Sequence, residues 1–192
     1  MIAIINYNAG NILSVQNALN RLGYENILTD DIDTIQKADK VIFPGVGEAS
    51  SAMRYVKERQ LDSTICNLTQ PVLGICLGLQ LMCESSQEGD TDCLGIFDTQ
   101  VKRFPAYDIV PHMGWNSIDG LKSELFQSLS SSLDMYFVHS YYAEICSHTV
   151  AKGNYITPFS AALQKDNFYA VQFHPEKSAD LGEQILMNFL KL

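Results

Sequence analysis

The sequence predicts an α/β fold in which a mostly parallel sheet is covered by helices. Through the first half of the chain, short apolar runs alternate with amphipathic stretches, a pattern typical of βαβ units. Hydrophobic residues make up 46% of the chain and charged residues 18%, which is the composition of a folded protein rather than a disordered one. At 192 residues the chain is expected to form one domain, over residues 1–192.

The first predicted unit is a strand, a helix and a second strand. Ile2–Ile5 is an apolar run that we expect to be the first strand. Asn11 can cap the helix that follows, and Gly23 stands where a left-handed C-terminal cap is needed. Ile27 and Leu28 are expected in the next strand. The positions that recur at helical spacing between the caps are Ile12, Val15, Gln16, Leu19 and Leu22.

The next predicted unit contributes two more strands. Val41–Phe43 is an apolar run that ends at the turn Pro44–Gly47, and Val72–Ile75 is the fourth strand. A helix is expected between them, with an apolar face made of Ala49, Ala52, Met53 and Val56.

The second half of the chain is less regular after Leu81. Strands are expected at Met135–Val138 and Tyr169–Phe173, so the sheet is predicted to become mixed there, and the polar run Ser128–Ser132 is expected to be a surface turn. A C-terminal helix is predicted from one continuous apolar stripe, formed by Leu181, Ile185, Leu186, Phe189 and Leu190.

Charge and cysteine content narrow the class of protein. A formal net charge of -9 argues against nucleic-acid binding, which needs clustered Lys and Arg. No basic leader and no apolar run of about 20 residues is visible, so a cytoplasmic location without membrane contact is expected. The five cysteines form no CxxC pair, so reduced thiols are expected, and nothing indicates a metal or a cofactor.

One of these cysteines lies in a motif that favours catalysis. Gly74–Gly78 follows a predicted strand and precedes a helical run, so it matches a nucleophile elbow with Cys76 in the place of serine. The N-terminus of the following helix favours a thiolate and can stabilise an oxyanion. A cysteine without this context is more often a small buried hydrophobe.

A cysteine nucleophile also needs a base, and His174 is the best placed of the four histidines. It ends a predicted strand, and Pro175 interrupts the ladder so that Glu176 can turn back and orient the imidazole. Taken alone, a His before a Pro is more often a structural strand end, but the cysteine elbow favours catalysis. The other three histidines, which we expect to be structural or exposed, are His112, His139 and His148.

The turn Pro44–Gly47 is the candidate for an oxyanion site. Its two glycines allow the peptide to reorient, so that an N–H near Gly47 can join the N–H of Leu77. A phosphate-binding loop is excluded, because the remaining glycine and the lysine of such a motif are missing.

In this order, the segments PGVG, GICLGLQLM and QFHPEKS resemble the class I (triad) glutamine amidotransferases, over nearly the whole chain. Segments Asn6–Asn11, Pro111–Asn116 and Phe137–Tyr141 are similar, more narrowly, to the glutaminase subunits of imidazole glycerol phosphate synthase, an enzyme of histidine biosynthesis. The resemblance implies a flavodoxin-like three-layer fold that hydrolyses L-glutamine to glutamate and ammonia. It also implies a heterodimer with a (β/α)8-barrel cyclase that receives the ammonia.

The resemblance assigns roles to individual residues. Cys76 is implied as nucleophile, His174 as general base and acid, and Glu176 as the orienting carboxylate. The glutamine and oxyanion site is implied at Gly47, Leu77, Gln80, Ser140 and Tyr141, and the partner interface at Asn8, Asn11, Trp115 and Lys177. The chain departs from the family pattern at Glu48–Ser51, which leaves the packing of that loop open.

Two alternatives stay open at this point. The chain could be the glutaminase of another ammonia-using synthase, although the segment Pro111–Asn116 and the short length argue against it. It could also be a catalytically silent module that regulates a synthase, although the intact set of Cys, His and Glu favours an enzyme. A peptidase or a thiol redox protein fits Glu176 and Gln80 poorly.

Overall fold

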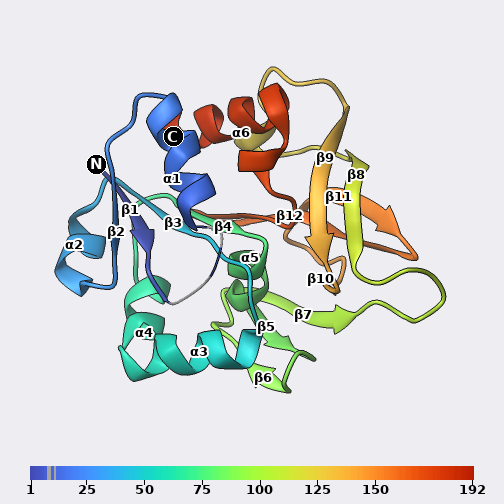
Figure 1. Cartoon of the computed structure of the whole chain (residues 1–192), viewed down its shortest axis with the longest axis horizontal. Helices are drawn as coiled ribbons and strands as arrows, with labels where there is room; N and C mark the ends of the chain where they lie inside the picture. The colour runs from blue at the N-terminus through green and yellow to red at the C-terminus, as the bar shows by residue number, and fades with distance from the viewer. Residues whose placement is uncertain (8–9, 11) are drawn as a thin grey trace.

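The computed structural model describes residues 1–7, 10 and 12–192. In this part of the chain the strands form a nine-stranded and a four-stranded sheet (Figure 1). The helices are α1 (Ile12–Arg21), α2 (Ile32–Lys37), α3 (Ala49–Glu58), α4 (Leu61–Cys66), α5 (Leu77–Met82) and α6 (Ala179–Lys191), with the 3-10 turns η1 (Glu124–Phe126) and η2 (Pro175–Lys177).

The large sheet is parallel in one half and antiparallel in the other. Its strands, in order across the sheet, are β2 (Asn26–Thr29), β1 (Ile2–Ile5), β3 (Lys40–Phe43), β4 (Val72–Ile75), β13 (Phe168–Val171), β12 (Thr157–Lys165), β11 (Thr149–Tyr155), β8 (His112–Asp119) and β9 (Ser132–His139). The first five pair in parallel, and the pairs from β13 to β9 are antiparallel. The small sheet has the order β10 (Tyr141–Ala143), β7 (Phe97–Arg103), β5 (Cys83–Ser86) and β6 (Thr91–Asp92).

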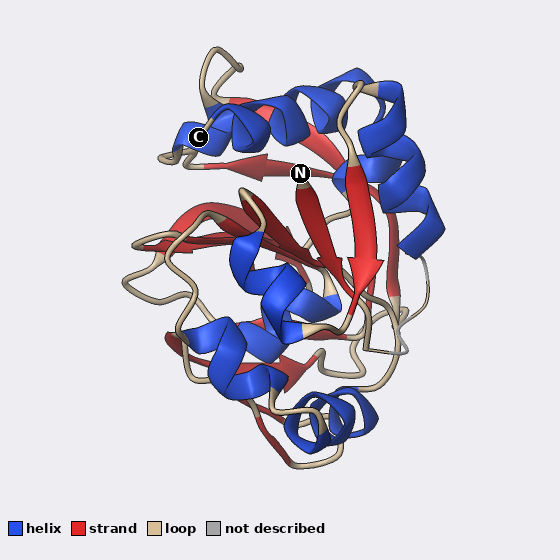
Figure 2. Ribbon diagram, turned by 90° about the vertical axis from the view of Figure 1, so that its left-hand side faces the viewer, coloured by secondary structure: helices blue, strands red, loops and turns tan. Residues whose placement is uncertain are grey.

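Helices cover both faces of the parallel half. α1 and α6 lie on one face, and α3, α4 and α5 lie on the other (Figures 1 and 2). β1 shows why, since Ile2 and Ile4 belong to one apolar cluster while Ala3 and Ile5 belong to the other. A strand buried on both faces needs apolar residues throughout rather than in alternation. This arrangement confirms the predicted three-layer α/β fold.

The helix and strand predictions of the first half are confirmed, with two helices missed. Gly23 has a φ of 81° and ends α1 as expected, whereas the predicted cap Asn11 lies outside the described residues. The sequence did not reveal α2 and α4, because six residues are too few to show helical periodicity. Glu48, which departs from the family pattern, caps α3 by accepting the N–H of Ser51 (3.0 Å).

The second half differs more from expectation. The small sheet was not predicted, because its strands are short and only one of them alternates clearly. β13 ends at Val171, two residues before the expected Phe173. Beyond it, the N–H of His174 donates to the carbonyl of Tyr136 on β9 (2.9 Å). The predicted turn at Ser128–Ser132 overlaps β9, which begins at Ser132. No helix in the described ranges is long and apolar enough to cross a membrane.

The start of α5 packs directly against the end of β3. A Cβ atom on Gly78 would lie 1.8 Å from the carbonyl oxygen of Phe43, so any side chain would push the helix away from the sheet. This close approach fixes the position of the residue that joins β4 to α5, which is Cys76.

Replacing Gly78 with Ala is therefore expected to lower the free energy of unfolding by about 3 kcal/mol, because the clash is with backbone. Denaturant unfolding measures this change. Asn17→Ala, on the exposed face of α1, is the control and should stay within about 0.5 kcal/mol of the parent. Equal stability of the two variants would contradict the packing described.

Candidate functional site

Cys76 lies on a strained turn between β4 and α5. Its backbone has φ 54° and ψ -105°, a conformation that L residues rarely adopt outside functional sites. Its N–H donates to the carbonyl of Val171 on β13 (2.8 Å), which continues the parallel pairing of Ile75 with Val171. The predicted elbow is present, and the Cys76 residue is 5% exposed.

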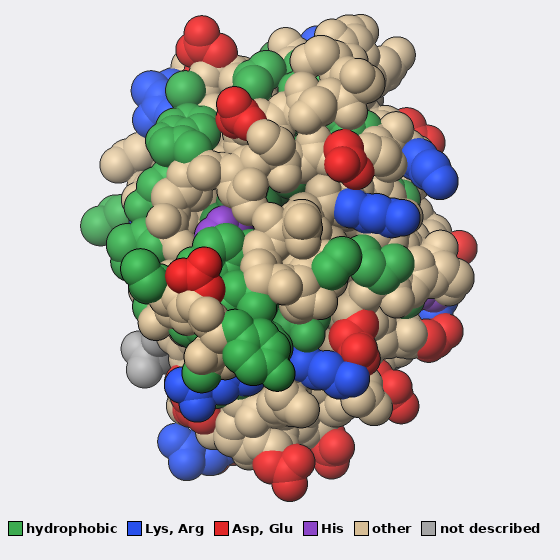
Figure 3. Space-filling model, turned by 90° about the vertical axis from the view of Figure 1, so that its right-hand side faces the viewer, with side chains coloured by type: hydrophobic (Ala, Val, Ile, Leu, Met, Phe, Trp, Pro, Cys, Tyr) green, Lys and Arg blue, Asp and Glu red, His purple; other side chains and the backbone are tan. Residues whose placement is uncertain are grey.

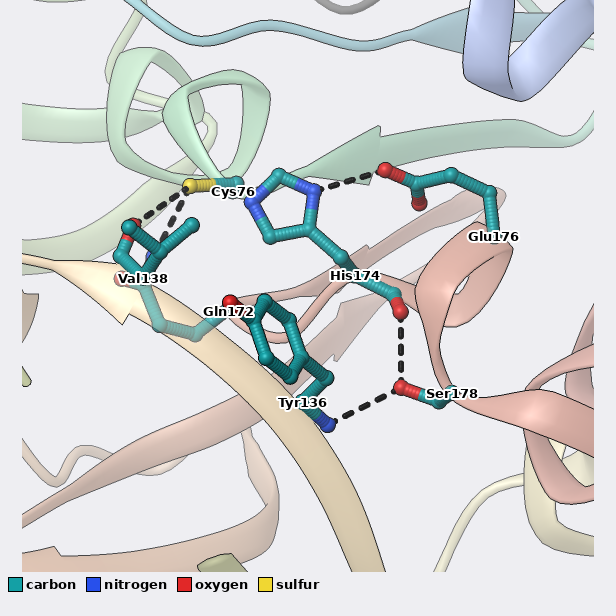
Figure 4. Close-up of polar contacts among 7 residues, drawn as sticks. All are labelled: Cys76, Tyr136, Val138, Gln172, His174, Glu176 and Ser178. Atoms are coloured by element: carbon teal, nitrogen blue, oxygen red, sulfur yellow. Dashed lines mark hydrogen bonds and ion pairs between the residues drawn. The ribbon is translucent and has the colours of Figure 1, made fainter. Parts of the chain in front are cut away.

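His174 and Glu176 form a buried pair beside this turn. Nδ1 of His174 donates to Oε1 of Glu176 (2.7 Å), and the two side chains are 1% and 0% exposed. The other ring nitrogen of His174 faces Cys76 (Figure 4). Nδ1 therefore orients the ring while Nε2 faces Cys76.

The main chain at His174 is held by neighbouring elements. Oγ of Ser178 donates to the carbonyl of His174 (2.7 Å) and accepts the N–H of Tyr136 on β9 (3.0 Å). These bonds are drawn below the imidazole in Figure 4. The end of β13, β9 and the start of α6 thus fix the histidine together.

The charge on Cys76 and Glu176 favours a protonated His174. Burial on its own lowers the pKa of the imidazole, but the Cys76 thiolate and the Glu176 carboxylate outweigh it and raise the pKa to about 10. The site is thus suited to a His174 imidazolium facing Cys76 at neutral pH.

The turn Pro44–Gly47 accepts three hydrogen bonds, two from the segment after β1 and one from the start of α5. The carbonyl of Pro44 accepts the hydroxyl of Tyr7, and the carbonyl of Val46 accepts the N–H of Gly10 (3.1 Å). The carbonyl of Gly45 accepts the N–H of Leu77 (3.2 Å). This last bond occupies one of the two predicted oxyanion donors.

An oxyanion site therefore requires the turn to move. Gly45 and Gly47 have φ values of 156° and 145°, which glycine adopts without the cost that other residues meet. Rotation of the Gly45 carbonyl away from the elbow would free the N–H of Leu77. The roles of Gly47 and Leu77 as donors stay predictions.

A cavity of about 260 Å³ opens in front of Cys76. All the residues that the sequence assigned to glutamine and oxyanion binding line this cavity, and they are Gly47, Leu77, Gln80, Ser140 and Tyr141. Other lining residues include Val46, Pro111 and Val138. A separate cavity of about 190 Å³ lies on the far side of the turn and does not include Cys76.

Two residues of the site were missed by the sequence analysis. Glu88 lines the cavity, and Oε2 of its carboxylate accepts the N–H of Ala49 (2.8 Å). Burial raises the pKa of the Glu88 carboxyl. Glu88 is the acidic side chain among the lining residues, so its carboxylate can pair with an ammonium group.

The second missed residue is Gln172, which is fully buried and whose Nε2 donates to Sγ of Cys76 (3.6 Å). Only its place in QFHPEKS, two residues before His174, could have indicated it.

The residues predicted to face a partner are exposed where the structure describes them. Trp115 on β8 is 56% exposed and Lys177 in η2 is exposed, while Asn8 and Asn11 lie outside the described residues. Apolar side chains gather on the face at the right of Figure 1, where β8 and the loop before it lie (Figure 3). The large exposed apolar residues of that segment are Tyr107, Ile109, Met113 and Trp115. Their interface role stays a prediction.

Comparisons with known proteins show the family to which the chain belongs. The family model described as glutamine amidotransferase class-I matches residues 3–192. The imidazole glycerol phosphate synthase subunit HisH of Bacteroides fragilis strain YCH46 is 59% identical, over 100% of this chain and 99% of the relative. The HisH subunit of Haemophilus influenzae strain Rd is 47% identical, over 99% of this chain and 96% of the relative.

Solved structures share the fold at low identity. PurLQS from Thermotoga maritima superposes with a TM-score of 0.76 at 14% identity, covering 99% of this chain and 97% of the other. The glutaminase domain of CTPS from Trypanosoma brucei, solved with bound acivicin, has a TM-score of 0.65 at 15% identity, covering 99% of this chain and 93% of the other. The chain belongs to the class-I glutamine amidotransferase family and, within it, to the HisH subunits of imidazole glycerol phosphate synthase.

Proposed function

We propose that Cys76, His174 and Glu176 hydrolyse L-glutamine in the cavity in front of Cys76. The observation that carries this assignment is the arrangement of His174, which donates one ring nitrogen to Glu176 and turns the other toward Cys76. A catalytically silent module would have no need to bury this ion pair, because burying charges costs free energy.

The first half of the reaction forms a thioester. The Cys76 thiolate attacks the carboxamide carbon, and the developing negative charge on oxygen is stabilised by N–H donors at the turn and the elbow. As the C–N bond breaks, the His174 imidazolium gives its proton to the departing nitrogen, so ammonia leaves. His174 is then neutral, and Cys76 carries the glutamyl group.

The second half returns the site to its starting state. Neutral His174 takes a proton from water, which attacks the thioester carbon and releases glutamate. The thiolate leaves, and the imidazolium faces it again. Glu176 keeps Nδ1 protonated throughout, which leaves the other ring nitrogen free to exchange protons with the reacting groups.

Two features of the cavity suit glutamine as the substrate. The carboxylate of Glu88 can pair with its α-ammonium group, and Gln80 with the backbone of Ser140 and Tyr141 can bind the polar groups beside it. The ammonia would pass to the cyclase subunit of imidazole glycerol phosphate synthase, a (β/α)8 barrel forming a heterodimer with this chain in the cytoplasm. That partner would also free the N–H of Leu77, so the chain alone should be weakly active.

Cys76→Ala is expected to lower glutamate release by at least about a thousandfold in the presence of the cyclase, because the nucleophile is lost. An enzymatic glutamate assay measures the rate, and titration with the cyclase checks that binding is retained. Cys66→Ala, at an exposed thiol remote from this cavity, is the matched control and should keep the parent rate. Normal turnover by Cys76→Ala would exclude the proposed nucleophile.

The raised pKa of His174 also predicts the alkaline limit of the first half-reaction. The imidazolium is the proton donor, so the rate should hold through neutral pH and fall as the pH rises through about 10. Glu176→Gln removes a charge that raises this pKa, so the fall should begin at lower pH. Single-turnover ammonia release against pH tests this, with Glu183→Gln on the surface of α6 as the control. An unchanged alkaline limb in Glu176→Gln would contradict the role of Glu176.

A further inference from the structure

The wall of the cavity includes His139, one of a buried pair of histidines that the mechanism does not use. His112 on β8 and His139 on β9 face each other in the antiparallel register, and they are 4% and 5% exposed. Nδ1 of His112 and Nε2 of His139 are 2.9 Å apart, within hydrogen-bond distance. From the sequence, only a structural or exposed role is expected for either histidine.

The direction of this bond follows from the carbonyl of Tyr141. Nδ1 of His139 lies 2.7 Å from that oxygen, and a carbonyl oxygen only accepts, so Nδ1 of His139 must carry the proton. Nε2 of a neutral His139 is then an acceptor. His112 must donate to it through Nδ1, which leaves Nε2 of His112 as an acceptor.

Asn116 donates the hydrogen bond that Nε2 of His112 accepts. Its Nδ2 lies 3.2 Å from Nε2 of His112. The orientation of the amide is fixed independently, because Nδ2 also donates to the carbonyl of Asn154 (3.0 Å) and Oδ1 accepts the N–H of Ser117 (2.8 Å). One arrangement of protons satisfies every bond from Asn116 to Tyr141.

From the Tyr141 carbonyl, the hydrogen-bond network continues to Cys76, the proposed nucleophile. The carbonyl of Tyr141 also accepts Nε2 of Gln80 (2.9 Å), and the same amide group donates to Oε1 of Gln172 (3.1 Å). Nε2 of Gln172 donates in turn to Sγ of Cys76 (3.6 Å). The histidine pair is thus connected both to the cavity wall and to the reacting sulfur.

Both rings are neutral at neutral pH. Burial lowers the pKa of His112 to about 4 and that of His139 to about 3, despite the bond from His139 to Tyr141. Packing accounts for the place of the His112 ring, which stacks between Tyr155 (centroids 4.1 Å apart) and Phe137 (4.9 Å apart). Packing does not account for the unbroken set of donors and acceptors.

We propose that His112 and His139 are positioning residues for glutamine. His112 donates to Nε2 of His139 and so holds that ring in place, with its Nδ1 proton on the Tyr141 carbonyl that the Gln80 amide also bonds. This inference rests on the proposed location of glutamine in the cavity that Gln80, Ser140 and Tyr141 line. Neither histidine takes part in proton transfer to substrate.

Two replacements of His112 separate positioning from packing. His112→Phe keeps a stacked ring but removes both nitrogens, so Nε2 of His139 loses the donor that holds its ring in place. His112→Asn loses the stacking but keeps an N–H donor near the position of Nδ1. For the chain with its cyclase, we expect KM for glutamine to rise about tenfold in His112→Phe, with kcat within about threefold, and to be largely restored in His112→Asn.

A purely structural histidine predicts the opposite order, with His112→Asn the more damaged enzyme. That result, or a KM within twofold of the parent in His112→Phe, would overturn the inference. His148→Asn is the control, because His148 lies near Asp98 and outside this chain of bonds, and its KM should be unchanged. Failure of the proposed function is recognised separately, since Cys76→Ala would then still turn over glutamine.

NMR of ring-labelled histidine tests the same inference without relying on a variant that folds. In the parent protein, the nitrogen shifts of His139 should report a neutral ring protonated at Nδ1. In His112→Phe the same tautomer should persist, because the Tyr141 carbonyl still requires a proton on Nδ1, and Nε2 should shift to the value of an acceptor without a hydrogen bond. A parent protein in which His139 carries its proton at Nε2 would refute the proposed order of bonds.

Discussion

The parallel pairing of β4 with β13 is the contact on which the whole site depends. Ile75 lies opposite Val171, so the chain leaves the sheet at Cys76 on one strand while the next strand continues to His174 three residues later. Residues almost 100 positions apart in the sequence are thereby placed on the same edge of the sheet. The carboxyl ends of parallel strands commonly form the binding site in such folds, because loops from several strands converge there.

The strain at Cys76 is maintained by contacts on both sides of it. Its N–H bonds the end of β13, and the absence of a side chain at Gly78 allows α5 to press against the end of β3. The same elbow also holds the turn after β3, because Leu77 donates to Gly45. The structure thus joins Cys76 to the turn after β3, in a state where the N–H of Leu77 is already bonded. Under the proposed function, moving the Gly45 carbonyl would complete the oxyanion site, which would give a partner a simple means of control.

Much of this could be predicted from the sequence because the catalytic motifs are local. The Gly74–Gly78 elbow and the His174, Pro175, Glu176 run each specify a turn and a chemistry within a few residues. The contacts between distant segments were not visible. Glu88 lies in the turn between β5 and β6 of the small sheet, whose strands are too short to recognise, and the pairing of His112 with His139 depends on the register of β8 with β9. His174 was also expected at the end of a longer strand, whereas its backbone bonds to β9. Register and sheet order are set by packing of the whole domain, which local patterns do not contain.

The central claim is that Cys76, activated by His174, forms a covalent intermediate with glutamine. The most direct measurement is peptide mass spectrometry after reaction with a glutamine-mimicking electrophile, using all five thiols of the chain as internal competitors. The account predicts one adduct per chain, located on Cys76, formed more slowly when glutamine is added as protectant. Labelling spread over the other cysteines, or labelling of Cys76 that glutamine does not slow, would contradict it.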